Sequence, residues 1–233
     1  MPGRASTEFD AHSDSYRQEI EESISFVGGD LDLFTRLKAD ELLGLAQRVG
    51  TPDRLAFLDV GCGVGETDRF LQGCVGRLTG VDVAPLALER ARASNPWADY
   101  LDYTEGEALP VRDGSFDVCF AICVLHHVPK GERAALVGEM RRVCRPGGLV
   151  ALFEHNPFNP LTRRAVSGCE FDRDAELLSR REAMRLLSSA GMLHPQGRYV
   201  VFFPREGRLL RGIERRLGWL PLGAQYAAFA QRA

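Results

Sequence analysis

The sequence of 233 residues lacks the features that mark a membrane, secreted or nucleic-acid-binding protein. No apolar run approaches the ~20 residues that a membrane-spanning helix needs, and residues 1–8 lack the apolar core of a secretion signal. Neither half carries a run of Lys or Arg long enough to follow a phosphate backbone. We therefore expect a cytoplasmic protein with no membrane or nucleic-acid partner, in which the locally basic stretch 205–216 is the solvated face of a surface helix.

The six cysteines include no Cys-x-x-Cys pair, so the sequence carries no redox or zinc motif of that kind. Most of them lie in apolar segments, which favours free thiols in the core. Cys62 interrupts a glycine-rich stretch, where we expect its backbone rather than its thiol to meet a ligand. We predict no metal site.

What the sequence does have is an apolar strand that runs directly into three glycines. Residues 57–60 are followed by Gly61, Gly63 and Gly65, and Asp82 ends the next apolar segment. Glycine allows a sharp turn and a close approach of backbone to a ligand. An acidic side chain at the end of the second strand can bind the hydroxyls of a ribose. This pattern predicts a nucleotide cradle with Asp82 as its ribose ligand.

The glycine spacing indicates which nucleotide is bound. A dinucleotide fingerprint needs glycine at its first, third and sixth positions to bring a pyrophosphate onto a helix terminus. The sixth position here is Glu66, whose carboxylate would repel a pyrophosphate and favour a cationic ligand. The spacing therefore argues against a nicotinamide oxidoreductase.

The stretch Asp59-x-Gly-x-Gly-x-Gly resembles the first motif of the class I S-adenosylmethionine-dependent methyltransferases, of the small-molecule type with methyltransferase domain 11 or 25. Four further segments match that family in order, at 81–83, 106–110, 114–118 and 125–128, and the turn and strand at 145–153 complete the match. The resemblance covers roughly residues 55–155. It implies S-adenosyl-L-methionine as the cofactor and methyl transfer as the reaction.

The resemblance also implies which residues contact the cofactor. Glu107 departs from the family, which usually has Asp next to the adenine amine, and its longer side chain leaves a direct contact open. The expected cofactor residues are Tyr16, Asp59, Gly61, Cys62, Gly63, Gly65, Asp82, Val83, Glu107, Ala108, Ile122, Cys123 and His127.

Apolar segments and helical segments alternate along the chain, which predicts a doubly wound, Rossmann-like α/β fold with helices on both faces of a mostly parallel sheet. Strands are expected at 55–60, 77–82, 99–103, 117–122, 149–154, 198–203 and 224–231, and helices at 65–73, 85–94, 131–144 and 180–190. The resemblance implies that the last two strands are antiparallel at one edge, giving seven in all. We expect a single domain, with a helical cap at 1–45, the methyltransferase core at 46–233 and a substrate-loop insert at about 155–180.

Methyl transfer requires a base only where the acceptor must lose a proton, and imidazole suits that task near neutral pH. His155 follows an apolar strand, so it is our candidate for the general base, with Glu154 either orienting its ring or stabilising its charge. For His127 a functional role and a structural role are equally expected. His126, its neighbour, is expected to point elsewhere and to have a structural role. Tyr16 either closes over the methyl group or is a core residue of the cap.

The favoured function is methyl transfer to an oxygen, nitrogen or carbon of a small molecule, with a weak preference for a sugar or secondary-metabolite hydroxyl. Two alternatives remain: a reaction such as decarboxylation or cyclisation in the same cofactor pocket, and a cofactor-binding protein without turnover. The acceptor, and the choice between monomer and homodimer, stay open.

Overall fold

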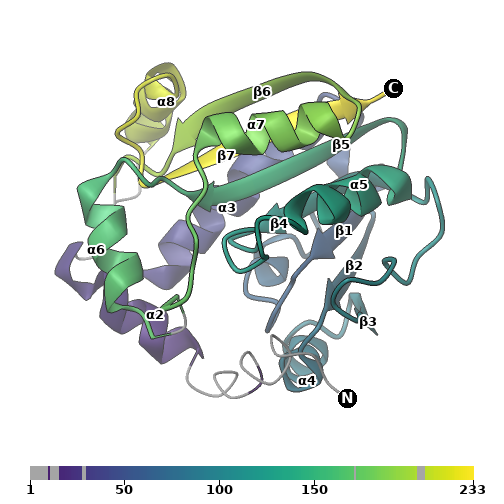
Figure 1. The fold of residues 1–233 in the computed structure, drawn as a ribbon, viewed down its shortest axis with the longest axis horizontal. Coiled ribbons are helices and arrows are strands. Elements are labelled where there is room, and N and C mark those ends of the chain that lie inside the picture. Colours follow the sequence, from purple (N-terminus) through teal and green to yellow (C-terminus); the bar gives the residue numbers. More distant parts are fainter. Residues whose placement is uncertain (1–9, 11–15, 28–29, 171, 204–207) are drawn as a thin grey trace.

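The computed structural model describes residues 10, 16–27, 30–170, 172–203 and 208–233. It contains a seven-stranded sheet in the order β3-β2-β1-β4-β5-β7-β6, as predicted for a Rossmann-like fold (Figure 1). Only β7 runs against its neighbours, since it pairs antiparallel with both β5 and β6. The strands are β1 (Ala56–Val60), β2 (Arg77–Asp82), β3 (Asp99–Asp102), β4 (Phe116–Ile122), β5 (Cys144–His155), β6 (Met192–Val200) and β7 (Gln225–Arg232).

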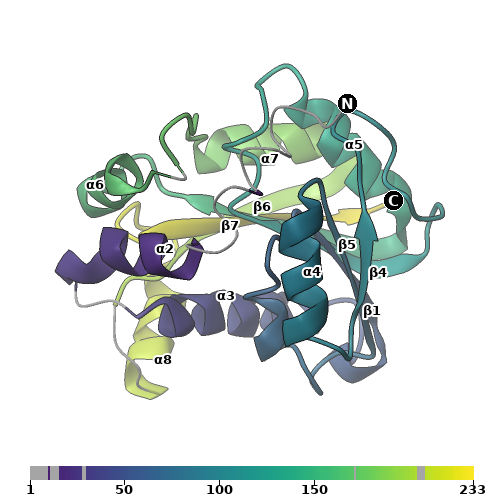
Figure 2. The ribbon, with the colours of Figure 1, turned by 90° about the horizontal axis from the view of Figure 1, so that it is seen from below.

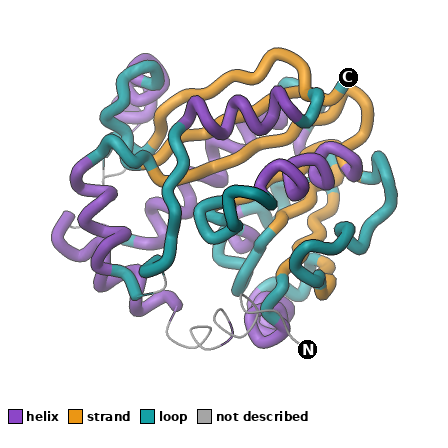
Figure 3. The backbone as a smooth tube through the Cα atoms, viewed as in Figure 1, coloured by secondary structure: helices purple, strands orange, loops and turns teal. Residues whose placement is uncertain are grey.

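Helices cover both faces of this sheet, which explains why its central strands are continuous apolar runs (Figures 1 and 2). One face carries α5 (Arg133–Val143) and α7 (Arg180–Ser189), and the other carries α3 (Leu31–Ala46) and α4 (Pro85–Ser94). In Figure 3 the strands form one layer between these helices. The layers place the carboxyl ends of the parallel strands at one edge, where open α/β sheets bind ligands.

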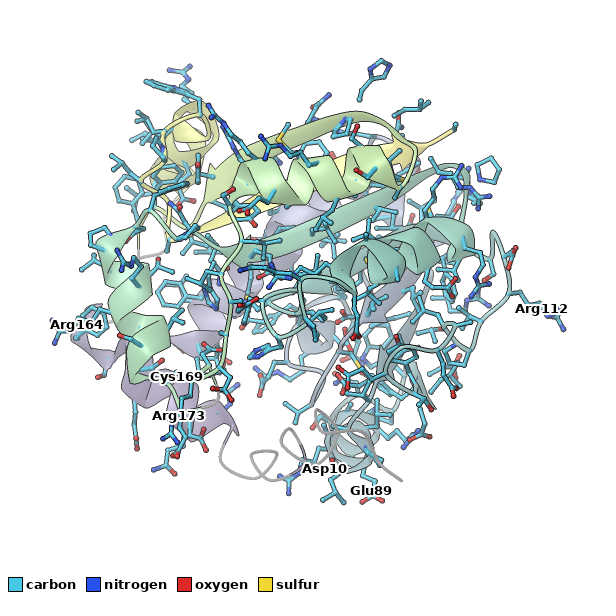
Figure 4. The ribbon with its side chains drawn as sticks, viewed as in Figure 1. Asp10, Glu89, Arg112, Arg164, Cys169 and Arg173 are labelled. Atoms are coloured by element: carbon cyan, nitrogen blue, oxygen red, sulfur yellow. The ribbon has the colours of Figure 1, made fainter. Side chains whose placement is uncertain are left out.

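Three further helices lie beside that layered core. They are α2 (Tyr16–Ile24), α6 (Pro160–Gly168) and α8 (Arg208–Leu217), and short 3-10 turns occur at Ser25–Val27, Pro52–Arg54 and Asp68–Phe70. Figure 2 shows α2 next to α6, and the two helices are in contact. At the other end of the molecule Asp10 lies beside α4 (Figure 4), where its carboxylate accepts the Leu86 N–H at 2.9 Å.

The helix expected at 65–73 is wrong. The segment contains only the 3-10 turn at Asp68–Phe70. Gly65 and Gly73 both have positive φ, 74° and 71°, so the segment is bounded by residues outside the helical region of backbone space. The side chain of Asp68 also turns into the protein, where it is fully buried.

The insert contains a helix that the sequence analysis did not expect. Asn159 caps α6, since its side chain accepts the N–H groups of Leu161 and Thr162. Pro160 then occupies the first turn, where its missing N–H costs nothing. The pair Asn159-Pro160 is thus the start of a helix.

Two boundaries also differ from expectation. β5 begins at Cys144 rather than near 149, and β6 runs over 192–200 rather than 198–203. Gly148 lies so close to its neighbours that a Cβ there would come within 2.7 Å of the Asp117 carbonyl oxygen.

No helix in the described part of the chain is long and apolar enough to cross a membrane.

Candidate active site

A cavity of about 1240 Å³ opens at the carboxyl edge of the sheet. Its walls come from the glycine loop after β1, the ends of β2, β4 and β5, the helices α2, α3 and α6, and the segment 169–176. Figure 4 labels Cys169 and Arg173 near the end of α6, where this last segment begins. The cavity exceeds the ~300–1,000 Å³ of a typical ligand pocket, so it has room for two reactants.

The glycine loop is fixed by Asp82. Gly61 and Gly63 have φ values of 76° and 52°, which favour glycine. A Cβ on Gly61 would come within 2.5 Å of the Val124 side chain, whereas a Cβ on Gly63 would meet nothing within 4 Å. The Asp82 carboxylate accepts the N–H of Gly63 at 2.7 Å and that of Ala84 at 2.9 Å. The side chain of Asp82, at the end of β2, therefore holds the glycine loop in place. Asp82 also lines the cavity.

Two buried carboxyls lie beneath this loop. Asp59 is 3% exposed and Asp68 is fully buried, where it accepts the Tyr100 hydroxyl at 2.7 Å. Burial and the charge of Asp68 raise the pKa of Asp59 well above its usual range. Burial raises the pKa of Asp68 to about 6, against the opposing hydrogen bond from Tyr100. The pair therefore holds a proton near neutral pH.

Asp59 also offers an unused acceptor to the cavity. Among the described residues none forms a hydrogen bond with its Oδ1, although this atom is buried. Lys38 is the nearby cation that lowers the pKa of Asp59, and it lines the same cavity. A buried acceptor of this kind suits a cationic ligand.

An ion cluster closes the rim of the cavity between α2, α3 and the glycine loop. Its members are Arg17, Asp32, Glu66 and Arg69. Arg17 donates to Asp32 at 2.6 Å and to Glu66 at 2.9 Å, and Arg69 donates to Asp32 at 2.8 Å. Glu66, which occupies the sixth position of the dinucleotide pattern, is therefore paired with arginine.

At the opposite end of the cavity Glu154 binds His126, so it does not orient the His155 ring, although its charge still acts on that ring. Glu154 is fully buried, and its Oε2 lies 2.6 Å from His126 Nδ1. Its Oε1 accepts the backbone N–H groups of Val124 and Leu125 at 3.1 and 2.7 Å. Successive side chains of a strand point to opposite faces, so Glu154 and its neighbour His155 diverge.

His126 does not point away from the other histidines. Its ring centroid lies 4.2 Å from that of His127 and 5.0 Å from that of His155, and all three residues line the cavity. The backbone reverses directly after β4, where Cys123 has a φ of 59° and the His127 N–H donates to the Val124 carbonyl. This tight turn brings the two adjacent imidazoles to one side.

Asp172 joins the histidines from the segment after α6. Its Oδ1 lies 3.4 Å from His126 Nε2 and 3.3 Å from His127 Nε2. Sequence analysis did not name Asp172 as a site residue. The signal available was the acidic stretch at 172–174 inside the insert.

The histidines beside Glu154 and Asp172 differ in their protonation. Burial opposes protonation of His126, but Glu154 and Asp172 outweigh it and raise the pKa of His126 to about 10. Burial, aided by the positive charge of His126, lowers the pKa of His155 to about 4. Burial also lowers the pKa of His127, so both His155 and His127 are neutral at pH 7, and His126 carries the positive charge of the group.

A buried arginine fastens the insert to the histidine turn. Arg133 is 4% exposed and donates to the Val128 carbonyl at 2.9 Å and to the Glu176 carbonyl at 2.7 Å. The Glu176 N–H donates to the His126 carbonyl at 2.8 Å. Sequence analysis missed Arg133, because nothing in its local pattern distinguishes it from a helix-surface arginine.

The cavity brings most of the expected site residues together. Those that line it are Asp59, Gly61, Cys62, Gly63, Asp82, Val83, Glu107, Ile122, Cys123, His127 and His155. Gly65, Ala108 and Glu154 lie outside its lining. A Cβ on Gly65 would come within 2.6 Å of the Asn95 amide, so this glycine faces the interior. The side chain of Tyr16 lies outside the described residues.

Comparison with protein families matches residues 58–152 to the methyltransferase domain. Over these residues, which make up less than half of the chain, the sequence is similar to the class I S-adenosylmethionine-dependent methyltransferases. The matched region includes the glycine loop and the acidic end of β2, which line the cavity at the carboxyl edge of the sheet.

Two curated methyltransferases illustrate the similarity. The 27-O-demethylrifamycin SV methyltransferase of Amycolatopsis mediterranei is 40% identical over 125 residues, which are 51% of this chain and 43% of the relative. An uncharacterized methyltransferase of Synechocystis is 33% identical over 103 residues, 44% of this chain and 48% of the relative. The matched region thus spans less than half of either relative.

Among solved structures, a SAM-dependent methyltransferase from Thermotoga maritima, described as a possible histamine N-methyltransferase, has a TM-score of 0.69. It is 18% identical, and the superposition covers 98% of this chain and 99% of that one. At this identity the likeness shows the methyltransferase fold alone.

Proposed function

We propose that this methyltransferase binds S-adenosyl-L-methionine and transfers its methyl group to a small-molecule acceptor. The observation that carries the proposal is the pair of buried carboxylates, Asp59 and Asp82, that line one end of the cavity. The buried Oδ1 of Asp59 receives no hydrogen bond from the described residues, and a cation would satisfy it. The sequence relatives, which are methyltransferases, support this assignment.

The residues at the glycine loop fit the cofactor. Asp82 is the ligand for the ribose hydroxyls, and Asp59 attracts the positive charge of the methionine part. Gly63 leaves the loop open to a ligand, because even a Cβ there would have no neighbour within 4 Å. When bound, S-adenosylmethionine supplies a methyl group on a positively charged sulfur, so positioning of the acceptor provides much of the rate enhancement.

We place the acceptor between the histidines and the apolar walls formed by α2, α3 and α6. Ile20, Phe34 and Leu161 line these walls and suit the carbon skeleton of the acceptor. His155 and His127 line the polar end, where the reacting atom would lie. In this arrangement neutral His155 accepts the proton of a hydroxyl acceptor, and His127 orients it.

The similarity to one named relative favours an oxygen acceptor of a secondary-metabolite type. The 27-O-demethylrifamycin SV methyltransferase, whose name specifies an oxygen acceptor, is the relative with 40% identity over the shared region. The insert at about 155–180 supplies α6 and Asp172 to the cavity and is thus our candidate for the substrate-recognition segment. The predicted cap at 1–45 contributes residues of α2 and of the first half of α3 to the opposite wall.

Calorimetric titration with S-adenosylmethionine, S-adenosylhomocysteine and NADH tests the cofactor. We expect micromolar binding of the first two and none of the third. A panel of hydroxyl, amine and carbon acceptors is then incubated with S-adenosylmethionine, and both products are analysed by mass spectrometry. Methylated acceptor with S-adenosylhomocysteine supports methyl transfer, whereas a changed acceptor without a new methyl group supports the non-methylating enzyme. Cofactor binding with no product from any acceptor favours the binding protein.

A further inference from the structure

The histidine end of the cavity brings three metal-ligating groups to one point. The two Nε2 atoms of His126 and His127 and an Oδ1 of Asp172 lie within 4.8 Å of one another. We propose that these three atoms bind a divalent transition-metal ion that faces the cavity. This metal site goes beyond the proposed methyl transfer and does not depend on it.

The distances suit a single ion. Asp172 Oδ1 lies 3.4 and 3.3 Å from the two nitrogen atoms. A tetrahedral ion with bonds of ~2.0–2.2 Å separates its ligand atoms by roughly 3.3–3.5 Å. The oxygen is therefore already at the spacing that a shared ion would impose on each oxygen–nitrogen pair.

His126 is held as a metal-bound histidine is held. In metal sites the second ring nitrogen usually donates to a carboxylate, which fixes the ring and its tautomer. Here that carboxylate is Glu154, whose Oε2 lies 2.6 Å from His126 Nδ1. The other oxygen of Glu154 accepts two backbone N–H groups, so this carboxylate can serve only as acceptor for the ring. The Nδ1 atom thus carries the proton, and Nε2 is directed to the proposed ion.

A second observation at His126 points to a ligand. The residue is 1% exposed, yet within the described part of the chain its Nε2 has no hydrogen-bond partner. Asp172 Oδ1 lies 3.4 Å away, longer than a usual hydrogen bond, and pairs with this atom only by charge. A buried ring nitrogen without a partner is costly, and an ion between it and Asp172 would satisfy both.

The site is built on a rigid frame. The histidines lie in the tight turn after β4, and Asp172 lies in the segment that Arg133 and Glu176 fasten to that turn. The three ligands therefore come from two segments that hydrogen bonds already hold together. Such preorganisation reduces the cost of assembling a metal site.

The ligand set selects the class of ion. Two imidazoles and one carboxylate suit Zn²⁺, Fe²⁺, Co²⁺ or Ni²⁺, whereas Mg²⁺ and Ca²⁺ prefer oxygen ligands. Three protein ligands leave coordination positions open to a substrate. If the proposed methyl transfer holds, an acceptor hydroxyl bound at such a position would lose its proton more readily. This consequence rests on the proposed function, and the metal site itself does not.

Without an ion, the same residues form a charge cluster in which protonated His126 lies between Glu154 and Asp172. Metal binding distinguishes the two arrangements. The protein is treated with chelator, dialysed and titrated with Co²⁺, followed by calorimetry and by the visible absorption of the ion. Zn²⁺ is then added as a competitor. We expect one Co²⁺ per chain, displaced by Zn²⁺ and not by Mg²⁺.

The variants Asp172→Asn and His127→Gln should each weaken Co²⁺ binding at least tenfold. Glu170→Gln, an exposed acid in the same segment, and His194→Asn, an exposed histidine on β6, serve as matched controls and should bind like the parent. Circular dichroism verifies the fold of each variant, and S-adenosylmethionine titration shows whether the cofactor end is intact. The proposal is overturned if the parent binds neither ion, or if both folded variants bind Co²⁺ as the parent does. Failure of cofactor binding alone would overturn the proposed function and leave the metal site standing.

Discussion

The two ends of the cavity treat charge in opposite ways. At the glycine loop Asp59 and Asp68 crowd two carboxyls together, and burial raises the pKa of both. At the other end each carboxylate, Glu154 or Asp172, lies against an imidazole, and the pKa of both carboxyls is lowered. At the first end Lys38 only partly offsets the carboxyls, so a cationic ligand would complete it. At the second end the charges of Glu154 and Asp172 are offset by protonated His126. A metal ion would bind there only if His126 loses a proton.

The largest effect should come from the balanced end. Glu154→Gln removes the buried charge that supports His126 and leaves two backbone N–H groups with a weaker acceptor. Breaking a buried pair of this kind costs about 3 kcal/mol in free energy of unfolding. Urea denaturation followed by circular dichroism measures it, with Glu170→Gln as the exposed control.

The same variant tests whether the ends are independent. Its affinity for S-adenosylmethionine should change less than about threefold under conditions where it is folded, because separate sites contribute additively. A much larger loss would mean that the histidine group also shapes the glycine loop, and the contrast between the ends would be lost.

The next effect belongs to the glycine loop. Asp82→Asn removes the charged acceptor of the Gly63 and Ala84 N–H groups and the proposed ribose ligand. A hydrogen bond to a charged group contributes ~1.5–3 kcal/mol, so the affinity for S-adenosylmethionine should fall about 100-fold. Calorimetry measures the change, and Asp99→Asn, an exposed acid on the neighbouring strand, is the control. Equal affinity in both variants would remove Asp82 from the cofactor site.

The smallest effect is a pH dependence of cofactor binding. In the free protein the pKa of Asp68 is about 6 and that of Asp59 is raised well above its usual range. A bound cation favours the charged carboxylates and lowers these pKa values, so binding should release a proton and strengthen as the pH rises. Linkage limits the gain to about tenfold per pH unit. Calorimetry from pH 6 to pH 8, in buffers of different ionisation enthalpy, measures the released proton.

Asp68→Asn supplies the comparison for that measurement. It removes the like charge beside Asp59 while keeping an oxygen for the Tyr100 hydroxyl. Proton release should fall in this variant. Unchanged release would place its source outside the carboxyl pair.

The sequence predicted the glycine-loop end better than the histidine end for a physical reason. Gly61 and Gly63 directly follow β1 and Asp82 ends the neighbouring β2, so their meeting follows from a local turn and a parallel register. Asp172 reaches His126 only through the path of the insert and through the Arg133 hydrogen bonds. A single sequence does not predict contacts between segments that share no local pattern.

The prediction for Glu154 failed for a reason that the sequence does contain. Adjacent side chains leave a strand on opposite faces, which disfavours a direct hydrogen bond between Glu154 and the His155 ring. The helix expected at 65–73 failed differently, because Gly65 and Gly73 at its two ends took positive φ values. The predicted strands, by contrast, agree with the structure at β1 and β2 to within a residue, because buried parallel strands leave a continuous apolar signal.

The position of β7 has a consequence for the order of folding during synthesis. Strand β6 pairs only with β7, which separates it from β5, and β7 follows both in the chain. A ribosome that has released β6 has therefore produced a strand whose sheet partner is not yet made. Gln225, the first residue of β7, lies 3.4 Å from His155 through its amide nitrogen. The cavity thus receives this part of its wall last, and a nascent chain cannot complete the acceptor end before residues 225–232 have emerged.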